Sequence, residues 1–101
     1  MPSRTTFAWD EEKNLLNQAK HGVSFEVAQY AFADRRRVIL KDAAHSRHEE
    51  RFYCLGNVGA GILTVRFTYL EQTIRIFGAG YWRKGKNIYE KENRKEDHLH
   101  K

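Results

Sequence analysis

Three consecutive segments rich in β-branched and aromatic residues constrain this chain more than any other feature. They cover residues 50–56, 63–69 and 74–77, and such residues favour a pleated, half-buried sheet. Residues that favour turns separate the segments, at Gly56-Asn57, Gly59, Gly61 and Glu71-Gln72. The sequence therefore predicts a run of antiparallel strands that pair in chain order.

Alternation along these strands divides their side chains between two faces. One face is apolar and consists of Phe52, Cys54, Leu63, Val65, Phe67, Ile74 and Ile76. The other face carries one arginine from each segment, namely Arg51, Arg66 and Arg75. Because the planar guanidinium group binds two phosphate oxygens at once, this face predicts a phosphate-binding surface. The alternative is a solvated face whose arginines only keep the sheet soluble.

Length and charge narrow the possible classes of protein. The 101 residues suffice for one two-layer domain, which we expect at residues 1–94, with a flexible tail at 95–101. Lys and Arg outnumber Asp and Glu by 18 to 13, which favours polyanionic partners. The single cysteine, Cys54, is expected to be a buried structural thiol, compatible with a reducing cytoplasm. No apolar run reaches the ~20 residues of a membrane span, so we expect a cytoplasmic protein.

Two short helices are predicted before the central strands, after an edge strand near Thr5–Trp9. Asp10 is a suitable N-cap for a helix that ends at about His21, before Gly22. Its buried stripe is predicted to be Leu15, Leu16 and Ala19. Ser24 is a suitable N-cap for a second helix from Phe25 to about Ala33. Both helices are expected to cover one face of the sheet.

A brief strand at Val38–Leu40 and a polar loop lead into the central strands, and one further helix follows them. This last helix is predicted from Tyr81 to about Arg94. Gly85 counts against it by ~1 kcal/mol relative to alanine. Ile88 and Tyr89 are its only apolar contacts, so it is expected to dock loosely or to be completed by a partner.

The sequence resembles the BrnT family, the toxin half of a type II toxin–antitoxin pair. The resemblance covers roughly residues 7 to 90 and depends on Phe7, Trp9-Asp10, Lys13-Asn14, Asn17, Lys20-His21-Gly22-Val23-Ser24-Phe25-Glu26, Ala28, Asp42, His45-Ser46, Glu49-Glu50-Arg51, Gly56 and Arg75-Ile76. It implies a compact RelE-like α+β fold and a ribonuclease activity that needs no metal or other cofactor. It also implies a neutralising antitoxin of the BrnA type, through which the complex binds operator DNA.

One position departs from the family pattern. Family members commonly continue Arg-Ile-Ile-Ser-Ala-Arg after the last strand, whereas this chain has Gly80 at the second arginine. Arg83 and Lys84 are the obvious substitutes for the missing cation. Tyr81 and Trp82 are expected to stack on an RNA base instead.

Metal-free RNA cleavage needs a base, an acid and a cationic clamp for the extra negative charge of the phosphorane. The candidates for catalysis are Arg51, Arg75, His45, Glu50 and Arg83. The candidates for RNA binding are Arg66, Lys84, Tyr53, Tyr81, Trp82 and Lys20. His45 and Glu50 lead for the proton transfer, with His48, Glu49, Lys20 and His21 as further choices. His21 is expected to cap the first helix.

Two alternatives to a metal-free ribonuclease remain. His45, His48 and Glu50 resemble a metal half-site, but no third ligand cluster follows, so no metal is expected. The loss of arginine at position 80 is also consistent with a non-catalytic homologue that acts as co-repressor with a DNA-binding antitoxin. In either case we expect an acidic or amphipathic antitoxin to cover the basic face and the last helix in a hetero-oligomer.

Overall fold

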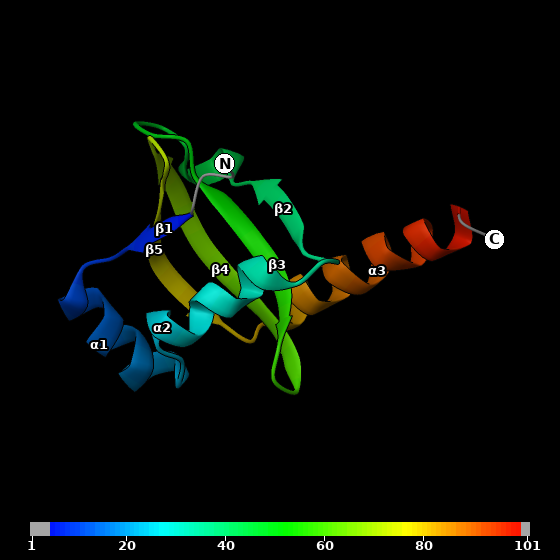
Figure 1. Cartoon of the computed structure of the whole chain (residues 1–101), viewed down its shortest axis with the longest axis horizontal. Helices are drawn as coiled ribbons and strands as arrows, with labels where there is room; N and C mark the ends of the chain where they lie inside the picture. The colour runs from blue at the N-terminus through cyan, green and yellow to red at the C-terminus, as the bar shows by residue number, and fades with distance from the viewer. Residues whose placement is uncertain (1–4, 100–101) are drawn as a thin grey trace.

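A computed structural model describes residues 5–99 of the chain (Figure 1). The fold is α+β, with a five-stranded sheet in the order β1-β5-β4-β3-β2. The strands are β1 (Thr6–Ala8), β2 (Val38–Lys41), β3 (Phe52–Val58), β4 (Gly61–Leu70) and β5 (Thr73–Gly80). Antiparallel pairing of β3, β4 and β5 in chain order confirms the prediction for the central strands. However, β1 runs parallel to β5, so the sheet is mixed and the prediction of a fully antiparallel sheet was wrong.

The breaks between the central strands differ in part from the predicted ones. Gly56 lies inside β3, and the chain turns instead at Gly59-Ala60, where Gly59 has a φ of +65°. The second turn is at Glu71-Gln72, as predicted. Gly56 is a glycine because the 3₁₀ segment η1 (Gln29–Ala33) crosses it: a Cβ at Gly56 would overlap the backbone carbonyl of Ala31.

Gly56→Ala should lower the free energy of unfolding by about 1–3 kcal/mol, because the added methyl group forces η1 away from the core. Urea denaturation of the variant and the parent protein measures this loss. Asn57→Ala, one residue further along the strand and exposed, is the matched control and should stay within about 0.5 kcal/mol of the parent. Equal stability of Gly56→Ala and the parent would contradict the close contact between β3 and η1.

The helices begin and end with the predicted capping residues. Asp10 accepts hydrogen bonds from the backbone N–H groups of Glu12 and Lys13 at the start of α1 (Glu11–His21), and Gly22 ends it with a φ of 70°. Ser24 caps α2 (Phe25–Ala28), which continues into η1. The predicted second helix is therefore confirmed in extent, although its second half has 3₁₀ geometry. Figure 1 shows α2 and η1 lying across one face of the sheet.

The predicted buried stripe of α1 was wrong. Leu15 and Leu16 are 60% and 56% exposed, Ala19 is also exposed, and the buried residues are Asn14 and Asn17. The Asn17 side-chain amide donates to the Ala79 carbonyl at 2.9 Å and accepts from the Ala79 N–H at 3.2 Å. A buried amide with both partners satisfied costs little. As a result, α1 is anchored to the backbone of β5 by hydrogen bonds, and its leucines remain in solvent.

The core lies between the sheet and the segment that contains α2 and η1. Its helical side consists of Val23, Phe25, Ala28 and Ala31, and its sheet side of Cys54, Leu63, Val65, Phe67, Ile74, Ile76 and Ala79. The predicted apolar face is thus confirmed, with Phe52 only partly buried. Cys54 is fully buried, and burial raises the pKa of its thiol to about 12, as expected for a structural cysteine.

Helix α3 (Arg83–Leu99) begins two residues later than predicted, continues past the predicted end, and packs with its first turns on the opposite face of the sheet. Gly85 makes this contact possible, because a Cβ there would overlap the hydroxyl of buried Thr64. Interpreting Gly85 as a flaw in the helix was therefore wrong. The predicted flexible tail lies partly outside the described residues, at positions 100–101.

Tyr89 fastens α3 to the rest of the fold. Its hydroxyl donates to Oδ2 of Asp34 at 2.6 Å. Oδ2 of Asp34 also accepts a hydrogen bond from the Asn57 backbone N–H at 2.7 Å. Burial and the neighbouring carboxylate raise the pKa of Tyr89 to about 12. Figure 1 shows the remainder of α3 extending away from the sheet. Within residues 5–99, none of the helices is long and apolar enough to cross a membrane.

Candidate active site

A hollow of about 570 Å³ lies between the second face of the sheet and the first turns of α3. We call it the basic hollow. It is lined by Leu40, Lys41, His45, Tyr53, Leu55, Thr64, Arg66, Trp82, Lys84, Gly85 and Ile88. Five of the predicted site residues therefore surround one space: His45, Tyr53, Arg66, Lys84 and Trp82.

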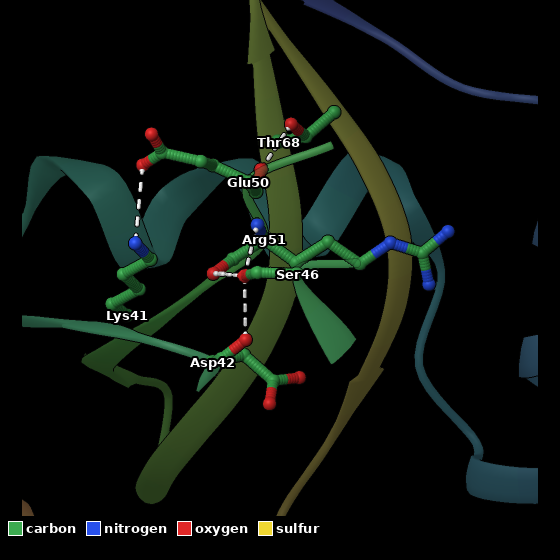
Figure 2. A network of polar contacts seen from close by, with 6 residues as sticks. All are labelled: Lys41, Asp42, Ser46, Glu50, Arg51 and Thr68. Carbon is green, nitrogen blue, oxygen red and sulfur yellow. Dashed lines mark hydrogen bonds and ion pairs between the residues drawn. The ribbon is translucent and has the colours of Figure 1, made fainter. Parts of the chain in front are cut away.

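The loop that carries His45 is fixed by hydrogen bonds to the start of β3 (Figure 2). The Asp42 backbone N–H donates to the Arg51 carbonyl at 2.7 Å. Ser46 completes the link, since its hydroxyl donates to the Asp42 carbonyl at 2.6 Å and accepts from the Arg51 N–H at 2.9 Å. Residues Ala43–His45 form a single 3₁₀ turn, η2, within this loop. The loop that was predicted to be polar therefore has a fixed conformation, which positions the His45 imidazole.

Asp42 holds the His45 ring in one orientation. His45 Nδ1 lies 2.9 Å from the Oδ2 atom of Asp42, whose side chain is only 6% exposed. Burial opposes ionisation of Asp42, but hydrogen bonds from His45 and Tyr53 and the charge of His45 together keep its pKa below the usual value. Because an ionised carboxylate can only accept, Nδ1 is the nitrogen that donates to Asp42, and Nε2 is left as the candidate atom for proton transfer.

Tyr53 belongs to the same network. Burial and the Asp42 carboxylate raise the pKa of its phenol, although the charge of Arg66 lowers it somewhat. Tyr53 on β3 is paired directly with Arg66 on β4. Sequence reasoning missed Asp42 as the partner of His45, although its position three residues earlier in the Asp42-x-x-His45-Ser46 run was a usable signal.

Arg66 faces a second hollow as well as the first. Arg66 on β4 is paired with Gly78 on β5, and a β-bulge leaves Phe77, the residue before Gly78, without a partner on β4. The second hollow, of about 320 Å³, is called the α1 hollow and is lined by Lys13, Leu16, Asn17, Lys20, His21, Arg66, Phe77, Gly78 and Trp82. Arg66 and Trp82 line both hollows, so the predicted RNA-binding residue Lys20 lies in the space next to that of His45.

The other two sheet arginines lie on the same face as Arg66, farther along the strands. The Arg51 guanidinium carbon is 4.4 Å from the centre of the Phe77 ring, within range of a cation–π contact. Arg75 on β5 is paired with Thr68, two positions from Arg66 on β4. Neither lines the basic hollow. The three cations thus form a band on the face opposite the core.

Glu50, Arg83 and Tyr81 also lie away from the basic hollow. Figure 2 shows Glu50 and Arg51 extending in opposite directions, and Glu50 Oε2 lies 3.8 Å from Lys41 Nζ. Arg83 and Tyr81 line a separate hollow, and the Tyr81 hydroxyl donates to the Val58 carbonyl at 3.0 Å. Of the two leading candidates for proton transfer, His45 therefore lines the basic hollow with Arg66 and Glu50 does not.

Position 80 has a steric reason to be glycine. A Cβ at Gly80 would lie 2.5 Å from Cζ2 and 2.6 Å from Cε2 of Trp82. The Trp82 and His21 rings meet in a T-shaped, edge-to-face contact, with centroids 5.1 Å apart. The indole thus fills the space that a side chain at position 80 would need. An arginine at that position is incompatible with Trp82 as it stands here.

Among the side chains that the structure describes, those of residues 5–95, no three or more His, Cys, Asp or Glu groups are placed to share a metal ion. The cationic groups of the basic hollow are instead side chains, those of Arg66, Lys84 and Lys41. His48, the other histidine of the postulated half-site, is exposed and does not line this hollow.

Comparison with known protein families gives one result that bears on these residues. The family model described as "Ribonuclease toxin, BrnT, of type II toxin-antitoxin system" matches residues 9–85, well over half of the chain. A search of curated proteins found no significant match. The matched segment includes α1, strands β2 to β5 and every residue of the basic hollow except Ile88. The chain therefore belongs to the BrnT family of ribonuclease toxins of type II toxin–antitoxin systems.

Proposed function

We propose that this chain is a metal-independent RNA endonuclease with a RelE-like fold that cuts RNA in the basic hollow and thereby inhibits translation in the cytoplasm. One arrangement supports this above all: the Asp42-held imidazole of His45 shares a hollow with Arg66 and Lys84. Phosphate transesterification requires a general base for the nucleophile and positive charge to stabilise the phosphorane, and these side chains can supply both.

The reaction uses the 2′-hydroxyl of the RNA as its nucleophile. Nε2 of His45 takes the proton of this hydroxyl, and the oxygen attacks the neighbouring phosphorus. Arg66 binds two oxygens of the resulting phosphorane, whose extra negative charge strengthens the interaction in the transition state. The ammonium group of Lys84, on the α3 side of the hollow, protonates the 5′-oxygen as it leaves. The products are a 2′,3′-cyclic phosphate and a 5′-hydroxyl.

The remaining cations hold the RNA backbone on either side of the cut. Arg51 and Arg75 continue the band of positive charge along the sheet, and Lys20 extends it into the α1 hollow. Phosphate contacts of this kind position a strand without reading its sequence. Arg83 and Tyr81 extend the contact surface beyond Trp82, through the separate hollow that they share.

A type II family implies an antitoxin protein, and we propose a BrnA-like partner that neutralises the toxin by covering the basic hollow. The net charge of +5 favours an acidic partner segment there. Exposed Leu16 at the rim of the α1 hollow, beside Lys13 and Lys20, offers apolar contact next to positive charge. Contact with operator DNA would then be made by the antitoxin in the complex.

Incubation of the purified chain with a long RNA tests the enzymatic function. We expect fragments that end in 2′,3′-cyclic phosphate, formed equally with and without a chelator. The assay has two arms, one with free RNA and one with translating ribosomes. The two arms distinguish an enzyme that cuts RNA alone from one that cuts RNA bound to the ribosome. Intact RNA in both arms contradicts a ribonuclease, and cleavage that the chelator abolishes contradicts a metal-independent one.

Induced expression separates this function from that of a catalytically weakened co-repressor. An active toxin arrests growth, whereas a co-repressor leaves the growth rate unchanged and acts only through the antitoxin complex. Growth at the full rate, together with intact RNA in vitro, would favour the co-repressor.

A further inference from the structure

Trp82 lies where the two hollows of the candidate active site adjoin. It lines the basic hollow with His45 and Lys84, and the α1 hollow with Lys20. Arg66 is the other residue common to both. A strand that runs from one hollow to the other therefore has to pass the indole and the Arg66 guanidinium together.

The indole is held firmly but remains accessible. Gly80 lies against Cζ2 and Cε2, and His21 contacts the ring from the end of α1. Even so, Trp82 is 37% exposed, an unusual amount for a tryptophan packed between a strand and a helix. A partly exposed aromatic ring flanked by cationic side chains is the arrangement that binds unpaired bases by stacking.

We infer that Trp82 is the stacking platform for one unpaired RNA base, with Lys20 on one side of it and Arg66 and Lys84 on the other holding the adjoining phosphates. This inference rests on the proposed function and adds the class of substrate. A base can reach the indole only when it is not paired, so the protein selects single-stranded RNA. Glycine at position 80 is what makes room for this platform.

Tryptophan fluorescence reports the stacking directly. The chain has two tryptophans, and Trp9→Phe leaves Trp82 as the only one, whose emission is excited selectively at wavelengths that tyrosine does not absorb. The probe is a short single-stranded RNA with 2′-O-methyl groups, which lacks the nucleophile and cannot be cut. We expect this RNA to quench the fluorescence, and the same strand annealed to its complement to quench and bind at least tenfold less.

Binding of the same probe to Trp82→Ala, Trp82→Phe and the parent protein measures the contribution of the ring by fluorescence anisotropy of a labelled RNA. Loss of one base–aromatic stack should weaken binding about five- to 150-fold for Trp82→Ala. Trp82→Phe should recover part of the affinity. Tyr30→Ala, which removes a 66% exposed aromatic residue on η1, is the matched control and should bind like the parent.

The outcomes distinguish this inference from the ribonuclease proposal. If RNA is cleaved but neither quenching nor a loss in Trp82→Ala is seen, the platform is wrong and the ribonuclease stands. If quenching and the affinity loss are seen without cleavage of ordinary RNA, the platform stands and the ribonuclease is wrong. Equal binding of duplex and single strand overturns the platform. Circular dichroism of each variant confirms that the fold is retained.

Discussion

Replacing His45 with alanine should lower the rate of RNA cleavage by about 10²–10⁴-fold, the usual contribution of a positioned general base. Asp42 and the Ser46 hydrogen bonds hold the imidazole at the basic hollow, with Nδ1 turned to Asp42 and Nε2 outside that contact. No other side chain in that hollow can take a proton as readily near neutral pH. Single-turnover cleavage of a labelled RNA measures the loss. The affinity for the uncleavable RNA should change little.

Two comparisons make the result specific to His45. His48→Ala removes an exposed histidine from the same loop and should leave the rate within about twofold, since surface changes away from a site have small effects. Asp42→Asn keeps the imidazole but replaces the carboxylate with an amide that can donate as well as accept, so the ring is no longer held in one tautomer and orientation; we expect a loss of about 10²-fold. A loss in His48→Ala as large as that in His45→Ala would contradict the assignment and revive the metal half-site.

Arg66→Ala should reduce the cleavage rate by about 10²–10³-fold, since a preorganised donor to the developing negative charge is worth this much in other enzymes. Arg66 lines both hollows and is paired across the sheet with Tyr53. Arg66→Lys should recover only part of the rate, because the ammonium group keeps the charge but cannot bind two phosphate oxygens in a planar fork. The same single-turnover assay separates the three proteins.

Arg35→Ala is the matched control for Arg66→Ala, because it removes the same charge from an exposed turn outside both hollows. If Arg35→Ala slows cleavage as much as Arg66→Ala does, the effect reflects net charge and general attraction of RNA. If Arg75→Ala or Arg51→Ala causes the larger loss, the cut occurs farther along the band of sheet arginines than the basic hollow.

The sequence by itself was sufficient to assign the faces of the sheet and the ends of the first helices. Alternation along β3, β4 and β5 separated the core residues from Arg66 and Tyr53, because side-chain direction in a strand has a period of two. Asp10, Gly22 and Ser24 marked the helix termini, since capping is satisfied within a few residues. The family, too, could be identified from motif residues.

Contacts between distant segments were decided only by the tertiary structure. Asn17 lies 62 positions from Ala79, yet its amide anchors α1 and leaves Leu15 and Leu16 in solvent. Gly56 and Gly85, which look like breaks or flaws in the sequence, are points where another element approaches closely. Their roles depend on which backbone lies above them. Strand alternation and helix capping depend on residues that are close in the chain, so the sequence reveals them. His45, Arg66 and Trp82 line one hollow only because a loop, a strand and the segment before α3 pack together.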